Sequence, residues 1–180
     1  TNRNGSTTDA RDIAALMDLG ENKPYNPLIQ GIGNSALPSN GANTLYGAIA
    51  NNPAFRNPST VSSALNGLGL LPVQDYEKTF ARKLNATEYI FNQQAGFISL
   101  NTTLQPDEVL GVAFQYTYNG RTYQVGEFAQ DVPSDTSKGV QKVLFLKLLK
   151  ATSQRTNLPI WDLMMKNIYS LDINNIQRDG

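Results

Sequence analysis

The sequence contains no cysteine and no histidine. Without cysteine the chain has no disulfide, no thiolate zinc site and no cysteine nucleophile. Without histidine it lacks the usual general base of serine hydrolases and the commonest ligand of zinc and iron. These absences exclude the enzyme classes that depend on either residue, and they favour a protein that binds over one that catalyses.

Charge of one sign and long hydrophobic runs are also absent. The 15 Lys and Arg residues balance the 15 Asp and Glu residues, so the net charge is zero. Nucleic-acid binding needs a basic patch that meets phosphates, and this balance argues against it. A membrane-spanning helix needs roughly 20 apolar residues, whereas the longest apolar run, 143–149, is interrupted by Lys147. We expect no nucleic-acid partner and no membrane span in this fragment.

At 180 residues, the chain is long enough to bury a core without covalent staples. Proline and glycine are dense before residue 72, and a soft boundary near this position separates two regions. Residues 1–72 form a helix- and loop-rich N-terminal segment, and residues 73–180 an antiparallel β-sheet region with a C-terminal helix. The chain starts at Thr1 without a signal peptide, so we expect one compact domain excised from a longer protein.

Residues 75–128 alternate apolar and polar side chains, which is typical of half-buried strands. Asn119-Gly120 lies between two aromatic runs and predicts a hairpin with a type I′ turn. Ala95-Gly96 predicts a second hairpin. The predicted strands are 75–84, 87–94, 97–100, 108–119 and 121–128. They indicate an α+β fold with a small antiparallel sheet or partial sandwich, to which 140–150 and 171–177 could add, packed with short helices.

Caps and apolar spacing predict two of the helices in the first 72 residues. Ile13, Leu16 and Met17 recur at intervals of three and four, which predicts a helix from residue 8 or 9 to residue 19. Asn57-Pro58 places proline directly after an N-cap residue, which predicts a helix that ends at Gly67.

Three further segments are assigned from shorter patterns. Residues 43–51 could form a short helix, and Leu158-Pro159 opens a predicted helix through residue 169. Residues 140–150 are ambiguous between strand and helix. Their β-branched start and short length favour a strand.

The aromatic residues are the candidates for a binding surface. Phe114, Tyr116 and Tyr118 share one strand face. Core packing is the simpler interpretation of such a stripe, and the alternative is an exposed patch that meets a partner. Tyr116, Tyr118 and Tyr123 could also bind a carbohydrate. Trp161 is expected to lie in the core or to anchor an interface.

Other motifs do not predict a catalytic, cofactor or metal site. Asp75 and Glu77 share a strand face and, with Glu108, could serve a hydrolase, but strand ends and caps explain them better. Residues 31–36 match the letters of a dinucleotide fingerprint without the strand before it or the helix after it. Residues 172–177 lack the glycine and distal glutamate of a calcium loop. We expect no cofactor and no metal.

Long strings of the chain resemble the SprA/Sov family of gliding-motility proteins, over roughly residues 37–170. The strings are LPSN (37–40), GFISLN (96–101), VAFQYT (112–117), YQVGEF (123–128) and LPIWDLMMKN (158–167). The resemblance implies a very large outer-membrane protein of Bacteroidetes, the translocon of the type IX secretion system, which passes folded cargo to the cell surface. The family has no known catalytic residues, so none are transferred here.

The resemblance implies a non-catalytic role in the cell envelope. Because the predicted strands are few and separated by helices and long loops, we expect a soluble domain inserted in the translocon. It would face the periplasm or the cell exterior, and its partners would be the translocon barrel, other secretion-system proteins or cargo. The alternative is a carbohydrate- or surface-ligand-binding β module.

Overall fold

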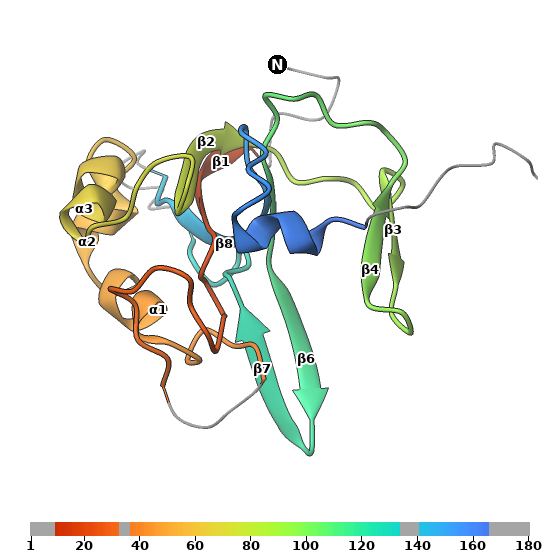
Figure 1. Cartoon of the computed structure of the whole chain (residues 1–180), viewed down its shortest axis with the longest axis horizontal. Coiled ribbons are helices and arrows are strands. Elements are labelled where there is room, and N and C mark those ends of the chain that lie inside the picture. Colours follow the sequence, from red (N-terminus) through yellow and green to blue (C-terminus); the bar gives the residue numbers. More distant parts are fainter. Residues whose placement is uncertain (1–9, 33–36, 134–140, 166–180) are drawn as a thin grey trace, which may run out of the picture.

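The computed structural model describes residues 10–32, 37–133 and 141–165 (Figure 1). The strands are β1 (Arg11–Leu16), β2 (Tyr76–Ala81), β3 (Tyr89–Asn92), β4 (Phe97–Leu100), β5 (Leu110–Val112), β6 (Phe114–Tyr118), β7 (Arg121–Val125) and β8 (Leu144–Lys150). The helices are α1 (Thr44–Ile49), α2 (Pro53–Arg56), α3 (Val61–Gly67) and the 3₁₀ helix η2 (Pro159–Leu163). The α+β class with small sheets and short helices is confirmed.

A four-stranded mixed sheet lies at the centre, in the order β2-β1-β8-β5. Strand β1 is antiparallel to β2, with Ile13 opposite Thr79, and parallel to β8, with Ile13 opposite Leu144. Strand β5 pairs antiparallel with β8 and is irregular between Leu110 and Gly111. Segments from both sides of residue 72 therefore share one sheet.

Each face of the central sheet carries its own hydrophobic cluster. Helices α1, α2 and α3 supply the first, and loops and η2 supply much of the second (Figure 1). The first contains Ala14, Leu16, Leu19, Ile29, Leu45, Ile49, Phe55, Val61, Leu65, Leu70, Tyr76, Val143 and Phe145. The second contains Ile13, Ala15, Met17, Val132, Leu144, Leu148, Ala151, Leu158 and Ile160. Successive β1 residues alternate between the two clusters, so the strand is buried on both faces.

The predicted helix over residues 8–19 is wrong, because its described part forms β1 and the turn that follows. A strand covered on both faces needs apolar residues at consecutive positions and shows no alternation with polar residues. Within that apolar run, Ile13, Leu16 and Met17 happen to fall at helical spacing. Gly20, directly after the predicted helix, has φ +82° and ends the segment that follows the strand.

The predicted single sheet over residues 75–128 is wrong, although its strands and both hairpins form. Only β2 and β5 join the central sheet, while β3–β4 and β6–β7 are separate two-stranded sheets. Asn119 (φ 48°) and Gly120 (φ 73°) both have positive φ, as the predicted type I′ turn requires. Alternation of apolar and polar residues indicates where a strand lies, but not which strand it pairs with. The pairing in the central sheet depends on β1 and β8, both of which are buried on their two faces. The strand prediction for 140–150 is confirmed by β8.

The predicted helices near 43–51 and 57–67 form as α1 and α3, each shorter than predicted. Helix α2 was not predicted, although Asn52 caps it by accepting a hydrogen bond from the N–H of Ala54 at 3.0 Å. The predicted helix from 158 is wrong in its described part, because only η2 forms and Met164 is already extended. Leu158 offers no side-chain cap to hold a longer helix. The rest of that helix and the predicted strand at 171–177 lie outside the described residues.

Candidate partner-binding site

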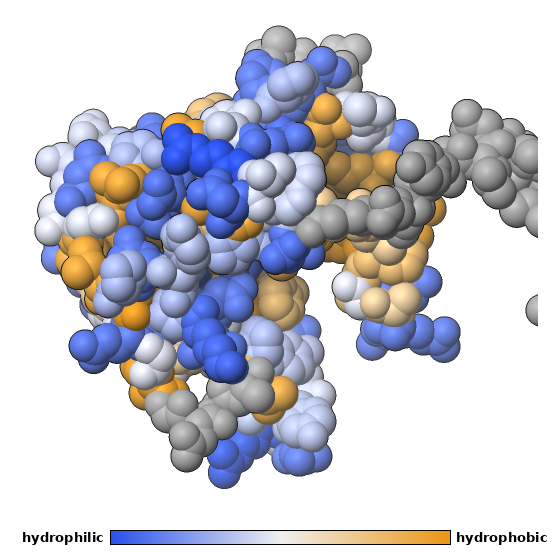
Figure 2. All heavy atoms as spheres, viewed as in Figure 1, coloured by the Kyte–Doolittle hydropathy of each residue, from blue (hydrophilic) through white to orange (hydrophobic). Residues whose placement is uncertain are grey.

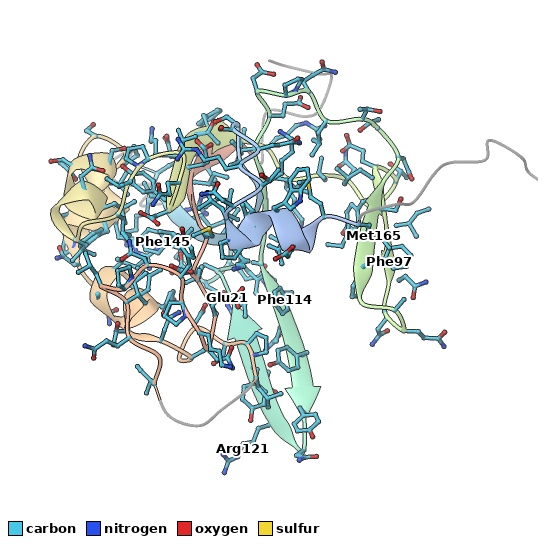
Figure 3. The ribbon with its side chains drawn as sticks, viewed as in Figure 1. Glu21, Phe97, Phe114, Arg121, Phe145 and Met165 are labelled. Atoms are coloured by element: carbon cyan, nitrogen blue, oxygen red, sulfur yellow. The ribbon has the colours of Figure 1, made fainter. Side chains whose placement is uncertain are left out.

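The β6–β7 hairpin has one aromatic face and one polar face. Its register places Tyr116 opposite Tyr123 and Tyr118 opposite Arg121. Because side chains alternate along a strand, the residues separate into two sets. The aromatic face carries Phe114, Tyr116, Tyr118, Arg121 and Tyr123, and the polar face carries Gln115, Thr117, Thr122 and Gln124. The hairpin extends from the body with Phe114 nearer its base and Arg121 at its tip (Figure 3).

The rings of the aromatic face stack along the hairpin. The centroids of Phe114 and Tyr116 are 6.2 Å apart, and those of Tyr116 and Tyr123 are 5.3 Å apart with 19° between the planes. Phe114 is 37% exposed and Tyr118 52% exposed, while Tyr116 and Tyr123 are half-buried. The core interpretation of this stripe is therefore wrong. A strand that projects from a domain alternates in the same way as one that packs on a core, so the sequence does not distinguish the two.

Tyr116 is held in place by the loop before α1. Its hydroxyl donates a hydrogen bond to the carbonyl oxygen of Pro38 at 2.7 Å. Burial, with a smaller contribution from Tyr123, raises the pKa of Tyr116 above its usual value. The hydroxyl therefore stays protonated at neutral pH and remains a donor.

Asn40 fixes the base of the hairpin through both its backbone and its side chain. Its N–H donates to the carbonyl of Gln124 at 2.7 Å. Its side chain accepts from the N–H of Gly126 at 2.8 Å and donates to the Gly126 carbonyl at 3.0 Å. Gly126 has φ +75°, and a Cβ there would lie 3.2 Å from the carbonyl oxygen of Val112. A side chain at this position would be strained, so glycine is required where the chain leaves β7.

Glu127, the next residue, anchors the hairpin to the core. It is 1% exposed, and its carboxylate forms a bidentate pair with Arg56 at 2.6 and 2.7 Å. The same carboxylate accepts from the Tyr46 hydroxyl and from the N–H of Phe145, each at 2.9 Å. The Arg56 guanidinium lies 4.3 Å from the centroid of the Phe145 ring. This network ties the end of the hairpin to α1, α2 and β8.

Burial is the main cause that raises the pKa of Tyr46 to about 12, and the charge of Glu127 adds to it. The phenol is thus neutral across the physiological range, and its hydroxyl donates a hydrogen bond to the Glu127 carboxylate. Burial and the charge of Glu127 both keep the Tyr46 hydroxyl protonated. Tyr46 therefore supports the Glu127–Arg56 pair without adding a second charge to the core.

Trp161 lies elsewhere, in η2. It is half-buried beside the buried Ile160, and with Lys150 and Met164 it lines a shallow hollow at the end of β8. The structure thus brings Tyr116, Tyr118 and Tyr123 together on one hairpin and places Trp161 on a separate element.

The acidic residues considered for a hydrolase hold local structure instead. The Asp75 carboxylate accepts from the N–H of Leu71 at 2.7 Å, and that of Glu77 accepts from the N–H and hydroxyl of Thr152 at 2.8 and 2.6 Å. Glu108 accepts from the N–H of Gln105 at 2.7 Å. Each carboxylate serves a different turn.

Residues 10–32, 37–133 and 141–165 contain neither a metal-binding cluster nor a membrane-spanning helix. Among these residues, no three Asp, Glu, His or Cys side chains gather in a way that could hold a metal ion. No helix described for the chain has both the length and the apolar character to cross a membrane. Residues 33–36 of the dinucleotide-like motif and all of 172–177 lie outside the described residues. No family model matches the chain, and no curated protein matches it.

The sequence did not indicate the three residues that hold the base of the β6–β7 hairpin: Asn40, Arg56 and Glu127. Their contacts join positions 71 or 86 residues apart, and no local pattern encodes such pairs. The sequence offered only one indirect indication of these contacts. Gly126 follows an alternating strand, and a glycine at such a place often marks a close backbone approach.

Replacing Asn40 with alanine should loosen the hairpin at its base. The substitution removes both side-chain bonds to Gly126, so we expect the free energy of unfolding to fall by about 1–3 kcal/mol. Urea denaturation measures this change, and faster hydrogen exchange at the Gly126 amide locates it. Gln115→Ala, on the exposed polar face, is the matched control and should stay within about 0.5 kcal/mol of the wild type. Equal losses in the two variants would contradict the role of Asn40.

Proposed function

We propose that this chain is a non-catalytic interaction domain of a type IX secretion translocon in the outer membrane, on its periplasmic or outer side. The resemblance of residues 37–170 to the SprA/Sov family supports the translocon. The observation that carries the interaction role is Tyr118, 52% exposed on a hairpin whose base is held by buried polar contacts. The aromatic face of β6–β7 then contacts the translocon barrel, a partner subunit or cargo.

The aromatic face is prepared for binding before a partner arrives. Tyr116 is fixed by Pro38 and by stacking on Tyr123, so little rotamer freedom remains to be lost on association. At the tip, Tyr118 lies opposite Arg121, and tyrosine and arginine are enriched among residues that dominate binding energy. Rings that are partly exposed in the free domain gain buried apolar area when a partner covers them.

Cross-linking in the cells that make the parent protein tests the proposal. A photoreactive phenylalanine analogue is placed at position 118 or at position 117. Positions 118 and 117 are neighbours on opposite faces of β6, so Thr117 is the matched control. We expect position 118 to cross-link to a protein of the secretion machinery or to cargo, and position 117 to give no such product. With the partner identified, Tyr118→Ser should weaken binding by about 30-fold, the scale of a dominant interface residue. Equal cross-linking at both positions would overturn the proposal.

The alternative function is a carbohydrate- or surface-ligand-binding module that uses Tyr116, Tyr118 and Tyr123. It is favoured by the exposure of these rings, since none of the three is fully buried. It is disfavoured by the positions of Tyr116 and Tyr123, which stack on each other and thereby occupy one ring face each. A glycan array separates the two functions: retention of a defined glycan by the wild type, lost in Tyr118→Ser, would support the alternative and count against the translocon contact.

A further inference from the structure

The second hairpin, β3–β4, is built differently from β6–β7. It forms a two-stranded sheet of its own, with Phe91 opposite Ile98 and Tyr89 opposite Leu100. It extends from the body and is separate from β6–β7 (Figure 1). Two strands without further packing are marginally stable in water. This hairpin is therefore incomplete as a structural unit.

One face of the hairpin is entirely apolar. Because side chains alternate along each strand, Tyr89, Phe91, Ile98 and Leu100 lie on the same face. Phe91 is 59% exposed and Ile98 is 37% exposed. On the opposite face, Ile90 is also 59% exposed. Figure 2 shows apolar surface along the hairpin and a hydrophilic tip.

The backbone of β3 also offers free hydrogen-bonding groups. The N–H of Asn101 donates to the carbonyl of Glu88, which marks these two residues as a hydrogen-bonded pair. Ladder bonds in an antiparallel pair alternate, so the peptide groups of Tyr89 and Phe91 point away from β4. In the described part of the chain, no strand pairs with this outer edge of β3. Among the described residues, this edge therefore has no partner strand.

The usual protections of an exposed edge are missing from this one. Natural edge strands carry charges, prolines or bulges that prevent pairing with another chain. No charged residue occurs between Glu88 and Asp107, and β3 contains neither proline nor a register shift. An unprotected edge with apolar side chains favours a partner strand that is itself uncharged, since an unpaired charge would be desolvated on contact.

The tip of the hairpin argues against insertion into lipid. Residues 93–96 form the turn, so the amide groups of Gln93 and Gln94 would enter the bilayer before the apolar residues of the strands do. Four-residue strands are also too short to span a bilayer, which needs about 9–11 residues per strand. A protein partner fits these features better than a membrane.

An ion pair lies at the base of the hairpin. Arg82 donates to both carboxylate oxygens of Glu88 at 2.6 and 2.8 Å. These bonds, followed by the one from the N–H of Asn85, lower the pKa of Glu88 to about 2. The pair therefore persists throughout the neutral range and fixes the residue that precedes β3.

We propose that the outer edge of β3 pairs with an extended, uncharged, apolar strand of a partner protein, which completes the hairpin as a three-stranded sheet. Main-chain hydrogen bonds to Tyr89 and Phe91 supply the pairing, and the apolar face supplies the burial. Strand β3 is assigned as the docking edge because its two central residues, Ile90 and Phe91, are the most exposed of the hairpin's large apolar side chains. This proposal is independent of the β6–β7 surface.

The probe for this proposal is an eight-residue peptide of alternating valine and threonine, blocked at both ends. Titrated into the full ¹⁵N-labelled chain, it should shift the amide signals of Tyr89 and Phe91 and slow their hydrogen exchange. A control peptide with proline at alternate positions cannot donate along one edge and should have little effect.

Three variants separate backbone pairing from other causes. Phe91→Pro removes an outward N–H while it leaves the β3–β4 bonds intact, as proline is tolerated on an edge. We expect it to weaken peptide binding by about tenfold or more. Phe91→Thr keeps the amide and should weaken binding less. Tyr118→Ser alters only the other hairpin and should bind as the wild type does, so failure of one proposed surface is distinguishable from failure of the other.

Two outcomes would overturn the proposal. Equal losses in Phe91→Pro and Phe91→Thr would show that the ring binds without strand pairing. Binding to phosphatidylcholine vesicles that is abolished in Phe91→Thr, with no shift on peptide addition, would identify a membrane as the occupant.

Discussion

Replacing Glu127 with glutamine is expected to lower the free energy of unfolding by about 3–5 kcal/mol, the scale observed when one partner of a buried ion pair is removed. The carboxylate is 1% exposed and receives hydrogen bonds from Arg56, Tyr46 and the N–H of Phe145. Glutamine keeps the shape but presents an NH₂ group to donors. The Arg56 side chain, itself 15% exposed, then lacks its counter-charge.

A surface ion pair provides the matched control for Glu127. Lys78 and Asp12 are 2.7 Å apart, with side chains 29% and 18% exposed. Lys78→Ala should therefore cost less than about 1 kcal/mol, since water screens both charges. The double variant Arg56→Met with Glu127→Leu should be more stable than Glu127→Gln alone, because it leaves no charge buried. Urea denaturation measures all three. A loss below 1 kcal/mol for Glu127→Gln would show that the anchor is not a major source of stability.

The sequence predicts what depends on neighbouring residues. Asn119-Gly120 determines its turn because two positive φ angles are needed there and these residues tolerate them. The cap of α1 is similarly local, since Asn43 accepts from the N–H of Leu45 two positions later. Strand β8 was predicted from a short apolar run. For the turn and the cap, the controlling contact lies within a few residues, and for β8 the apolar run is itself a local signal.

The sequence does not predict what depends on the two faces of a strand or on distant partners. Strand β1 reads as a helix because both of its faces are buried. The aromatic face of β6–β7 was predicted on the correct residues, yet its exposure depends on what the rest of the chain leaves uncovered. The Asn40–Gly126 contacts join positions 86 residues apart, and pairing at this separation leaves no periodic trace.

Gly20 packs directly against β7, in a backbone conformation that side chains rarely adopt. Its φ is +82°, where side chains are strained by about 1–2 kcal/mol. A Cβ at this residue would lie 2.6 Å from Cγ1 of Val125, which is 1% exposed. Overpacking of this kind costs a further 1–3 kcal/mol or so. We expect Gly20→Ala to lower the free energy of unfolding by about 2–5 kcal/mol, combining the two costs.

Gly47, in the exposed interior of α1, shows what the same substitution does without these constraints. No atom lies within 4 Å of the position of its Cβ, and alanine favours a helix over glycine, so Gly47→Ala should gain about 0.5–1 kcal/mol. The double variant Gly20→Ala with Val125→Ala removes the clash but keeps the backbone strain. Its loss should be smaller than the sum of the two single losses, since the residues touch. Strict additivity would mean that contact with Val125 does not limit the residue at position 20.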